Sequence, residues 1–105
     1  MKKLFLINLI ICSSIIFSGC EAENIFNGQA SKKYSSIYRI IKRKLDMLHF
    51  AFSEQDLMVP PANHFEHLKG NLSDYCSIRI NDQFRIVFIF QNGCAYDVQI
   101  MDYHK

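Results

Sequence analysis

The sequence lacks a net charge once its first residues are set aside. The formal charge is +2, and Lys2 and Lys3 account for all of it. From residue 21 onward, ten basic side chains balance ten acidic ones. Bulk charge therefore gives no indication of a nucleic-acid-binding protein, and any such surface has to arise locally.

The sequence also lacks the C-x-x-C spacing, internal repeats and low-complexity tracts. Its four cysteines stand at positions 12, 20, 76 and 94. Cys76 and Cys94 are predicted to be buried free thiols, although they could pair in an oxidising compartment. A chain of 105 residues has room for one domain.

No apolar run is long and uninterrupted enough to predict a membrane-spanning helix. The segment MKKLFLINLIICSSIIFSGC is interrupted by Asn8, Ser13 and Ser14. Its basic start, apolar centre and final Ser-Gly-Cys are typical of a lipoprotein signal peptide covering residues 1–19. Under this interpretation the chain is exported and Cys20 is the lipidation site, which would bring the protein to a membrane.

The strongest periodic signal predicts a helix over residues 35–52. One apolar stripe recurs at three- and four-residue steps (Ile37, Ile41, Leu45, Leu48 and Phe52), and Ser35 or Ser36 can cap the start. Six basic residues lie between residues 32 and 44, with no acidic residue among them. The exposed ones, Lys42 and Arg43 among them, are either a solvated helix face or a contact to an acidic partner or RNA phosphate.

After this helix the pattern changes toward strands. Ser53–Asp56 predicts a capping box on a short turn that ends at Pro60-Pro61. Strands are predicted at 63–68, 75–80, 84–90 and 95–101, the third of them central and covered on both faces. Asn92-Gly93 predicts the tight turn between the last two. Together these elements predict an α+β domain with helices on one face of a small antiparallel sheet.

The tight turn also predicts a register. If residue 91 pairs with residue 94, Arg85 lies opposite Ile100 and diagonal to Asp102, on the same face. His104 would continue that face, and Tyr103 would point the other way unless the tail bends. Arg85, Asp102 and His104 are therefore expected to converge.

Each candidate functional residue also has an interpretation in which it serves only the fold. Lys69 before Gly70 is typical of a turn, Arg85 could form an ion pair with Asp102 or Asp97, and a terminal Asp-Tyr-His-Lys is commonly frayed. His64 and His67 flank Glu66 and are metal-ligand types. In a strand His64 and His67 point to opposite faces, so no metal or other cofactor is expected.

Four segments, in this order and spacing, resemble one family. They are VPP-x-N-H, H-L-K-G, S-I-R-I-N-D-Q-x-R and A-Y-D-V-x-I-x-D-Y-H. The chain from about Glu23 to His104 resembles the HigB-type toxins of the RelE/ParE superfamily, the toxin halves of type II toxin–antitoxin pairs. The resemblance implies a RelE/ParE-like fold, ribosome-dependent and metal-independent mRNA cleavage, and a HigA-like helix-turn-helix antitoxin as partner. Departures at Asn71, Leu72 and Phe84 remove residues that are usual there.

The same resemblance implies site residues. Lys69 and Arg85 would hold the phosphate, with Arg79 as a further RNA-binding cation. Asp102, Tyr103 and His104 would form the catalytic tail. His104 is expected to transfer protons, because imidazole titrates near neutral pH.

The resemblance also offers a second interpretation of the N-terminus. Residues 1–13 would be an extension and residues 14–105 the toxin domain, with Ser14–Ser18 as a first strand at the far side of the sheet. Cleavage before Cys20 would delete that strand and expose a sheet edge. The ribosomal target that the resemblance implies is cytosolic, so we favour a cytoplasmic toxin. A degenerate toxin that binds antitoxin without efficient cleavage, and a lipid-anchored envelope protein derived from a toxin, are the alternatives.

Overall fold

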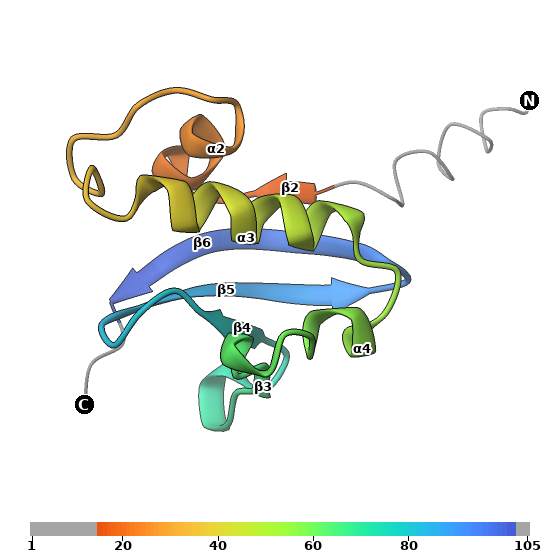
Figure 1. Cartoon of the computed structure of the whole chain (residues 1–105). Coiled ribbons are helices and arrows are strands. Elements are labelled where there is room, and N and C mark those ends of the chain that lie inside the picture. The colour runs from red at the N-terminus through yellow and green to blue at the C-terminus, as the bar shows by residue number, and fades with distance from the viewer. Residues whose placement is uncertain (1–14, 103–105) are drawn as a thin grey trace, which may run out of the picture.

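The computed structural model describes residues 15–102. In this part of the chain, helices cover one side of a five-stranded sheet (Figure 1). The strand order is β2-β6-β5-β4-β3. The strands are β2 (Ile15–Phe17), β3 (Glu66–His67), β4 (Cys76–Arg79), β5 (Phe84–Gln91) and β6 (Cys94–Asp102). The predicted α+β class is confirmed.

The centre of the sheet is the hairpin of β5 and β6. Asn92 and Gly93 both have positive φ, 53° and 78°, as the predicted tight turn requires. The run from Arg85 to Phe88 is buried, so β5 is covered on both faces as predicted. Cys76 on β4 and Cys94 on β6 are buried thiols that no disulfide joins, as expected from the sequence.

The sheet has one parallel edge, which the antiparallel prediction did not foresee. The predicted first strand is present as β2, and it runs parallel to β6 with Ile15 opposite Ala95 and Phe17 opposite Val98. A parallel pair needs a long crossover. Here the whole chain between β2 and β6 supplies it. Ile15 is buried in the main core cluster, so this edge belongs to the hydrophobic core.

The main helix, α3 (Tyr38–Phe50), lies along β5 and β6 (Figure 1). Its predicted stripe is confirmed at Ile41, Leu45 and Leu48, which are each at most 1% exposed. The helix begins later than predicted, because residues 33–37 form turns and Ile37 is the N-cap, without a side-chain cap bond. Phe52 lies beyond the helix and is 81% exposed, because the backbone becomes extended at Ala51.

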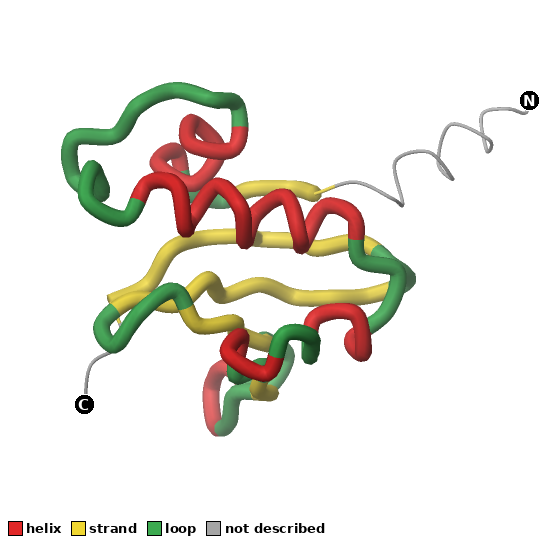
Figure 2. The backbone as a smooth tube through the Cα atoms, viewed as in Figure 1, coloured by secondary structure: helices red, strands yellow, loops and turns green. Residues whose placement is uncertain are grey.

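Shorter elements surround this core, and Figure 2 shows how much loop joins them. The α2 helix (Cys20–Phe26) packs Ile25 into the core beside α3. The α4 helix (Glu54–Leu57) has the predicted capping box between Ser53 and Asp56. Two 3-10 turns follow, η1 (Pro61–Asn63) and η2 (Gly70–Leu72). No helix within residues 15–102 is long and apolar enough to cross a membrane.

The strand predicted at 63–68 is largely wrong. Only Glu66–His67 pairs with β4. Asn63 ends η1, and His64 has left-handed backbone geometry with φ 44°. Pro61 starts the 3-10 turn that occupies this segment, and Asn63 is fully buried, so its side chain serves the core and not a strand face.

The predicted register fails midway along β6. It holds from Gln91–Cys94 to Ile89–Tyr96, and then shifts by one residue, so that Val87 faces Gln99. The cause is a β-bulge at Asp97, which has a φ of 57°. Arg85 consequently lies opposite Met101, not Ile100.

The shift changes which side chains share a face. Asp102 lies opposite Phe84, so its side chain is on the face of Phe84 and not on that of Arg85. The expectation that Arg85 and Asp102 project from one face is therefore wrong.

Candidate functional site: a cationic cleft

A cleft of about 850 Å³ opens beside β3 and β4. Phe84, Ile86 and Phe88 point toward the core under α3, so the alternate residue Arg85 points to the other face of the sheet. The cleft is on that other face. Its lining residues are His64, Glu66, His67, Leu68, Lys69, Leu72, Arg79, Asn81, Asp82 and Arg85.

Two arginines stand directly opposite each other in this cleft. Arg79 on β4 pairs with Arg85 on β5 in the strand register. Directly opposed residues lie on the same face with Cβ atoms about 4.5–5.5 Å apart, and like charges at such positions repel. An anionic group between the two guanidinium groups would relieve this repulsion.

The two arginines are held differently. Arg85 is only 7% exposed; its Nε donates to Ser77 Oγ at 2.7 Å, and its guanidinium also donates to the carbonyl oxygen of His64. Arg79 is more exposed and forms an ion pair with Asp82, whose side chain is fully exposed. Arg85 is thus fixed in place, whereas Arg79 can exchange its surface partner for a ligand.

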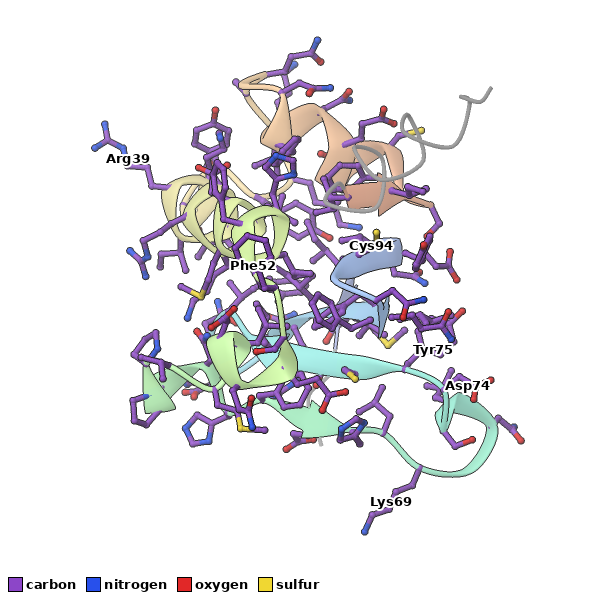
Figure 3. All side chains as sticks on the ribbon, turned by 90° about the vertical axis from the view of Figure 1, so that its right-hand side faces the viewer. Arg39, Phe52, Lys69, Asp74, Tyr75 and Cys94 are labelled. Atoms are coloured by element: carbon purple, nitrogen blue, oxygen red, sulfur yellow. The ribbon has the colours of Figure 1, made fainter. Side chains whose placement is uncertain are left out.

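Lys69 adds a third cation at the rim. It is the N-cap of η2 and is exposed, and Figure 3 shows it projecting from the loop at one end of the molecule. The turn depends on Gly70, which has a φ of 66° that other residues rarely adopt. Glu66 and Asp82 are the acidic groups of the cleft, so its balance is cationic.

The predicted catalytic tail is described only at its start. The backbone of Asp102 pairs with Phe84, beside Arg85, and Gln83 Nε2 donates to Asp102 Oδ2 at 3.1 Å. Tyr103 and His104 lie outside the described residues. Their catalytic roles remain predictions.

Lys42 and Arg43 are not part of the cleft. They lie on α3, on the other side of the sheet, where Lys42 Nζ binds Asp46 Oδ1 at 2.7 Å and Arg43 is exposed. Figure 3 shows the separation, with Arg39 of the same helix far from Lys69. Their predicted contact to RNA would therefore be separate from the cleft.

Sequence reasoning missed the role of Lys44. It is 5% exposed, and its ammonium group donates to Asn63 Oδ1. Burial lowers the pKa of Lys44, and Arg43 and Arg79 lower it further. Asn63 Nδ2 in turn donates to the Leu57 carbonyl oxygen at 2.9 Å. Lys44 therefore fixes the segment that carries His64.

A signal for Lys44 was present in the helical spacing. Positions 41, 44, 45 and 48 follow one face, so a lysine at 44 falls within the apolar stripe. A charged residue at such a position predicts a buried polar partner.

Comparison with solved structures identifies the fold. The YoeB dimer from Staphylococcus aureus is similar with a TM-score of 0.57 and 23% identity, covering 88% of this chain and 97% of that one. A YoeB/ParE toxin from Agrobacterium tumefaciens has a TM-score of 0.52 and 15% identity, covering 87% and 99%. The fold is therefore that of the YoeB and ParE toxins.

Sequence comparison identifies the family to which the chain belongs. A family model described as "RelE-like toxin of type II toxin-antitoxin system HigB" matches residues 23–104. Toxin HigB-1 of Vibrio cholerae is 48% identical over 71 residues, which cover 68% of this chain and 74% of that protein. The chain belongs to the HigB-like toxins of type II toxin–antitoxin systems, which confirms the resemblance found in the sequence.

Proposed function

We propose that this toxin cleaves mRNA on the ribosome and that the cationic cleft holds the phosphate being cleaved. The opposed pair Arg79–Arg85 carries this proposal, because two like charges in register on one face favour a bound anion. Lys69 would approach the same phosphate from the rim of the cleft. A ribosomal substrate places the activity in the cytoplasm.

The chemistry follows from charge and proton transfer. The ribose 2′-oxygen attacks the adjacent phosphorus, its proton passes to a base, and the 5′-oxygen leaves with a proton, so that a cyclic phosphate forms. Negative charge builds on the phosphate oxygens, and preorganised cations stabilise it. Arg85, already held by Ser77 and His64, needs little reorganisation for this task. We propose His104 for proton transfer, with Tyr103 beside it in the chain. Because the side chain of Asp102 is on the face opposite that of Arg85, we propose that Asp102 orients the tail and does not contact the phosphate.

The protein partner is proposed to be an antitoxin of the helix-turn-helix kind. One similar solved structure is a heterotetrameric YoeB–YefM toxin–antitoxin complex from Staphylococcus aureus. Membership of a toxin–antitoxin family supports an antitoxin for this chain as well. Co-purification with the product of a neighbouring reading frame tests this point.

The decisive experiment compares Arg79→Ala with Asp82→Ala. Purified variants are mixed with mRNA-programmed ribosomes, and cleavage is mapped by primer extension. Loss of one stabilising cation should lower the cleavage rate about 100-fold. Asp82→Ala breaks the same ion pair but keeps the cation, so it should cleave at least as fast as the wild type.

Three results would count against the proposal. Full activity in Arg79→Ala would show that the charge of Arg79 does not contribute to cleavage. Equal losses in both variants would show that the ion pair supports only the loop. A wild-type protein that captures antitoxin yet leaves mRNA intact on the ribosome would establish the degenerate-toxin alternative.

A further inference from the structure

A second cluster of reactive side chains lies beside the cleft. It joins Glu54 of α4, His67 of β3 and Cys76 of β4, whose ligand atoms all lie within 4.8 Å of one another. His67 and Cys76 face each other in the strand register. The position of α4 brings Glu54 to the same place, so packing of three separate elements builds this cluster.

The imidazole of His67 is engaged at both nitrogens. Nδ1 is 3.4 Å from Cys76 Sγ, and Nε2 is 3.0 Å from Glu54 Oε1. Zinc–sulfur and zinc–nitrogen bonds of about 2.3 and 2.0 Å at a tetrahedral angle would separate the two ligand atoms by about 3.5 Å. The spacing of Sγ and Nδ1 therefore already matches that of two ligands on one tetrahedral ion.

Glu54 is placed to orient His67 as a ligand of such an ion. A histidine that binds a metal through one nitrogen commonly donates its other N–H to a carboxylate, which fixes the tautomer and orients the ring. Glu54 Oε1 is at hydrogen-bond distance from Nε2 and leaves Nδ1 to the sulfur side. The arrangement is that of a carboxylate–histidine–metal triad with a thiol as the next ligand.

Access and charge also suit a cation. The Cys76 side chain is buried, with 3% of the residue exposed, but the side chains of His67 and Glu54 are 59% and 38% exposed. The carboxylate of Glu54 lies beside the two ligand atoms, and its negative charge favours a bound cation.

We propose that Cys76 Sγ and His67 Nδ1, oriented by Glu54, bind a thiophilic divalent ion of the zinc type, with water completing the tetrahedron. Binding converts the Cys76 S–H to a thiolate and releases its proton to solvent, with no change of oxidation state. This site differs from the one considered in the sequence, which paired His67 with His64. The site joins β3 to β4, and its ligand His67 is two residues before Lys69. A bound ion would therefore stiffen the rim of the cleft.

The test uses Co²⁺ as a spectroscopic probe on the full chain and then Zn²⁺ in competition with a chromophoric chelator. A thiolate bound to Co²⁺ gives a charge-transfer band in the near ultraviolet. The wild type should give this band at one ion per chain, and Zn²⁺ should abolish it. Affinity should rise with pH, because the thiol must lose a proton.

Variants separate this cluster from the thiols of Cys20 and Cys94. Cys76→Ser and His67→Ala should lose the band, and Glu54→Gln should keep it with about tenfold weaker binding. Cys94→Ser is the matched control, since Cys94 is an equally buried thiol on β6, and Cys20→Ser controls for an exposed thiol. Figure 3 shows Cys94 on β6, well away from Lys69.

Clear results would overturn the proposal. One is a wild type without a saturable band at a large excess of Co²⁺, which would leave the cluster as hydrogen bonds alone. Another is a band that survives in His67→Ala. Because His67 is exposed, His67→Ala should remain folded by circular dichroism, and it keeps the test valid if Cys76→Ser does not fold.

Discussion

The two edges of the sheet have opposite characters. The β2 edge is apolar, with Ile15 in the main core cluster and the ring of Phe17 5.4 Å from that of Phe26. The β3 edge is polar: both its residues, Glu66 and His67, are exposed and line the cleft. One edge completes the core, whereas the other presents side chains to a ligand. Changes at the first should therefore act on stability and changes at the second on function.

The largest expected effect comes from removing the β2 edge. A chain that starts at Cys20 loses the pairing of β2 with β6 and the burial of Ile15. This should cost about 5 kcal/mol, close to the whole stability of a small domain. A chain that starts at Ser14 should stay folded in thermal unfolding followed by circular dichroism.

This pair of truncations also decides between the two interpretations of the N-terminus. If the chain from Cys20 is as stable as the chain from Ser14, then β2 is dispensable and cleavage before Cys20 is compatible with a folded toxin. If it is unfolded, a lipoprotein processed at Cys20 could not keep this fold. The present contacts of Ile15 favour the second result.

A smaller effect compares one buried aliphatic residue at each edge. Ile15 and Leu68 are both 8% exposed, but only Ile15 belongs to the main core cluster. Truncation to alanine should cost about 3 kcal/mol at Ile15 and about 1–2 kcal/mol at Leu68, which lies outside that cluster. Urea unfolding of both variants measures the difference. Equal losses would contradict the contrast between the edges.

Much of this architecture could be predicted from the sequence. The stripe at Ile41, Leu45 and Leu48 located the main helix, and Asn92-Gly93 located the central hairpin. These signals are local, because they depend on spacing or on a backbone conformation that few residues adopt. The family resemblance supplied the strand at Ile15–Phe17, which has no strong periodic signal of its own.

What the sequence could not supply depends on tertiary context. The bulge at Asp97 moved Arg85 from Ile100 to Met101, and nothing in the local pattern distinguishes Asp97 from a regular strand residue. The helical spacing indicates that Lys44 is buried but not that its partner is Asn63, nineteen residues away. The arginine pair in the cleft follows from the register of β4 against β5, which the turn at residues 81–82 left ambiguous.

The smallest expected effect concerns a polar contact that connects the part of the sheet near β4 with the β2 edge. Tyr75, just before β4, donates its hydroxyl to Asp97 on β6, and Ser18, just after β2, donates to the same carboxylate. The bond from Tyr75, and then that from Ser18, lowers the pKa of Asp97, while burial opposes them. The bond to Asp97, with burial and nearby acidic charge, raises the pKa of Tyr75.

These shifts predict a stability window in pH. Because the folded pKa of Asp97 is lowered, its contribution is present above the ordinary aspartate pKa and is lost as pH falls through the lowered value. Because the folded pKa of Tyr75 is raised, its contribution is lost as pH rises through that value. Tyr75→Phe should therefore lower Tm most near neutral pH and least at both extremes. Tyr38→Phe on α3 should show no such profile, and a Tyr75→Phe deficit that stays constant with pH would mean that packing, not this bond, connects the two edges.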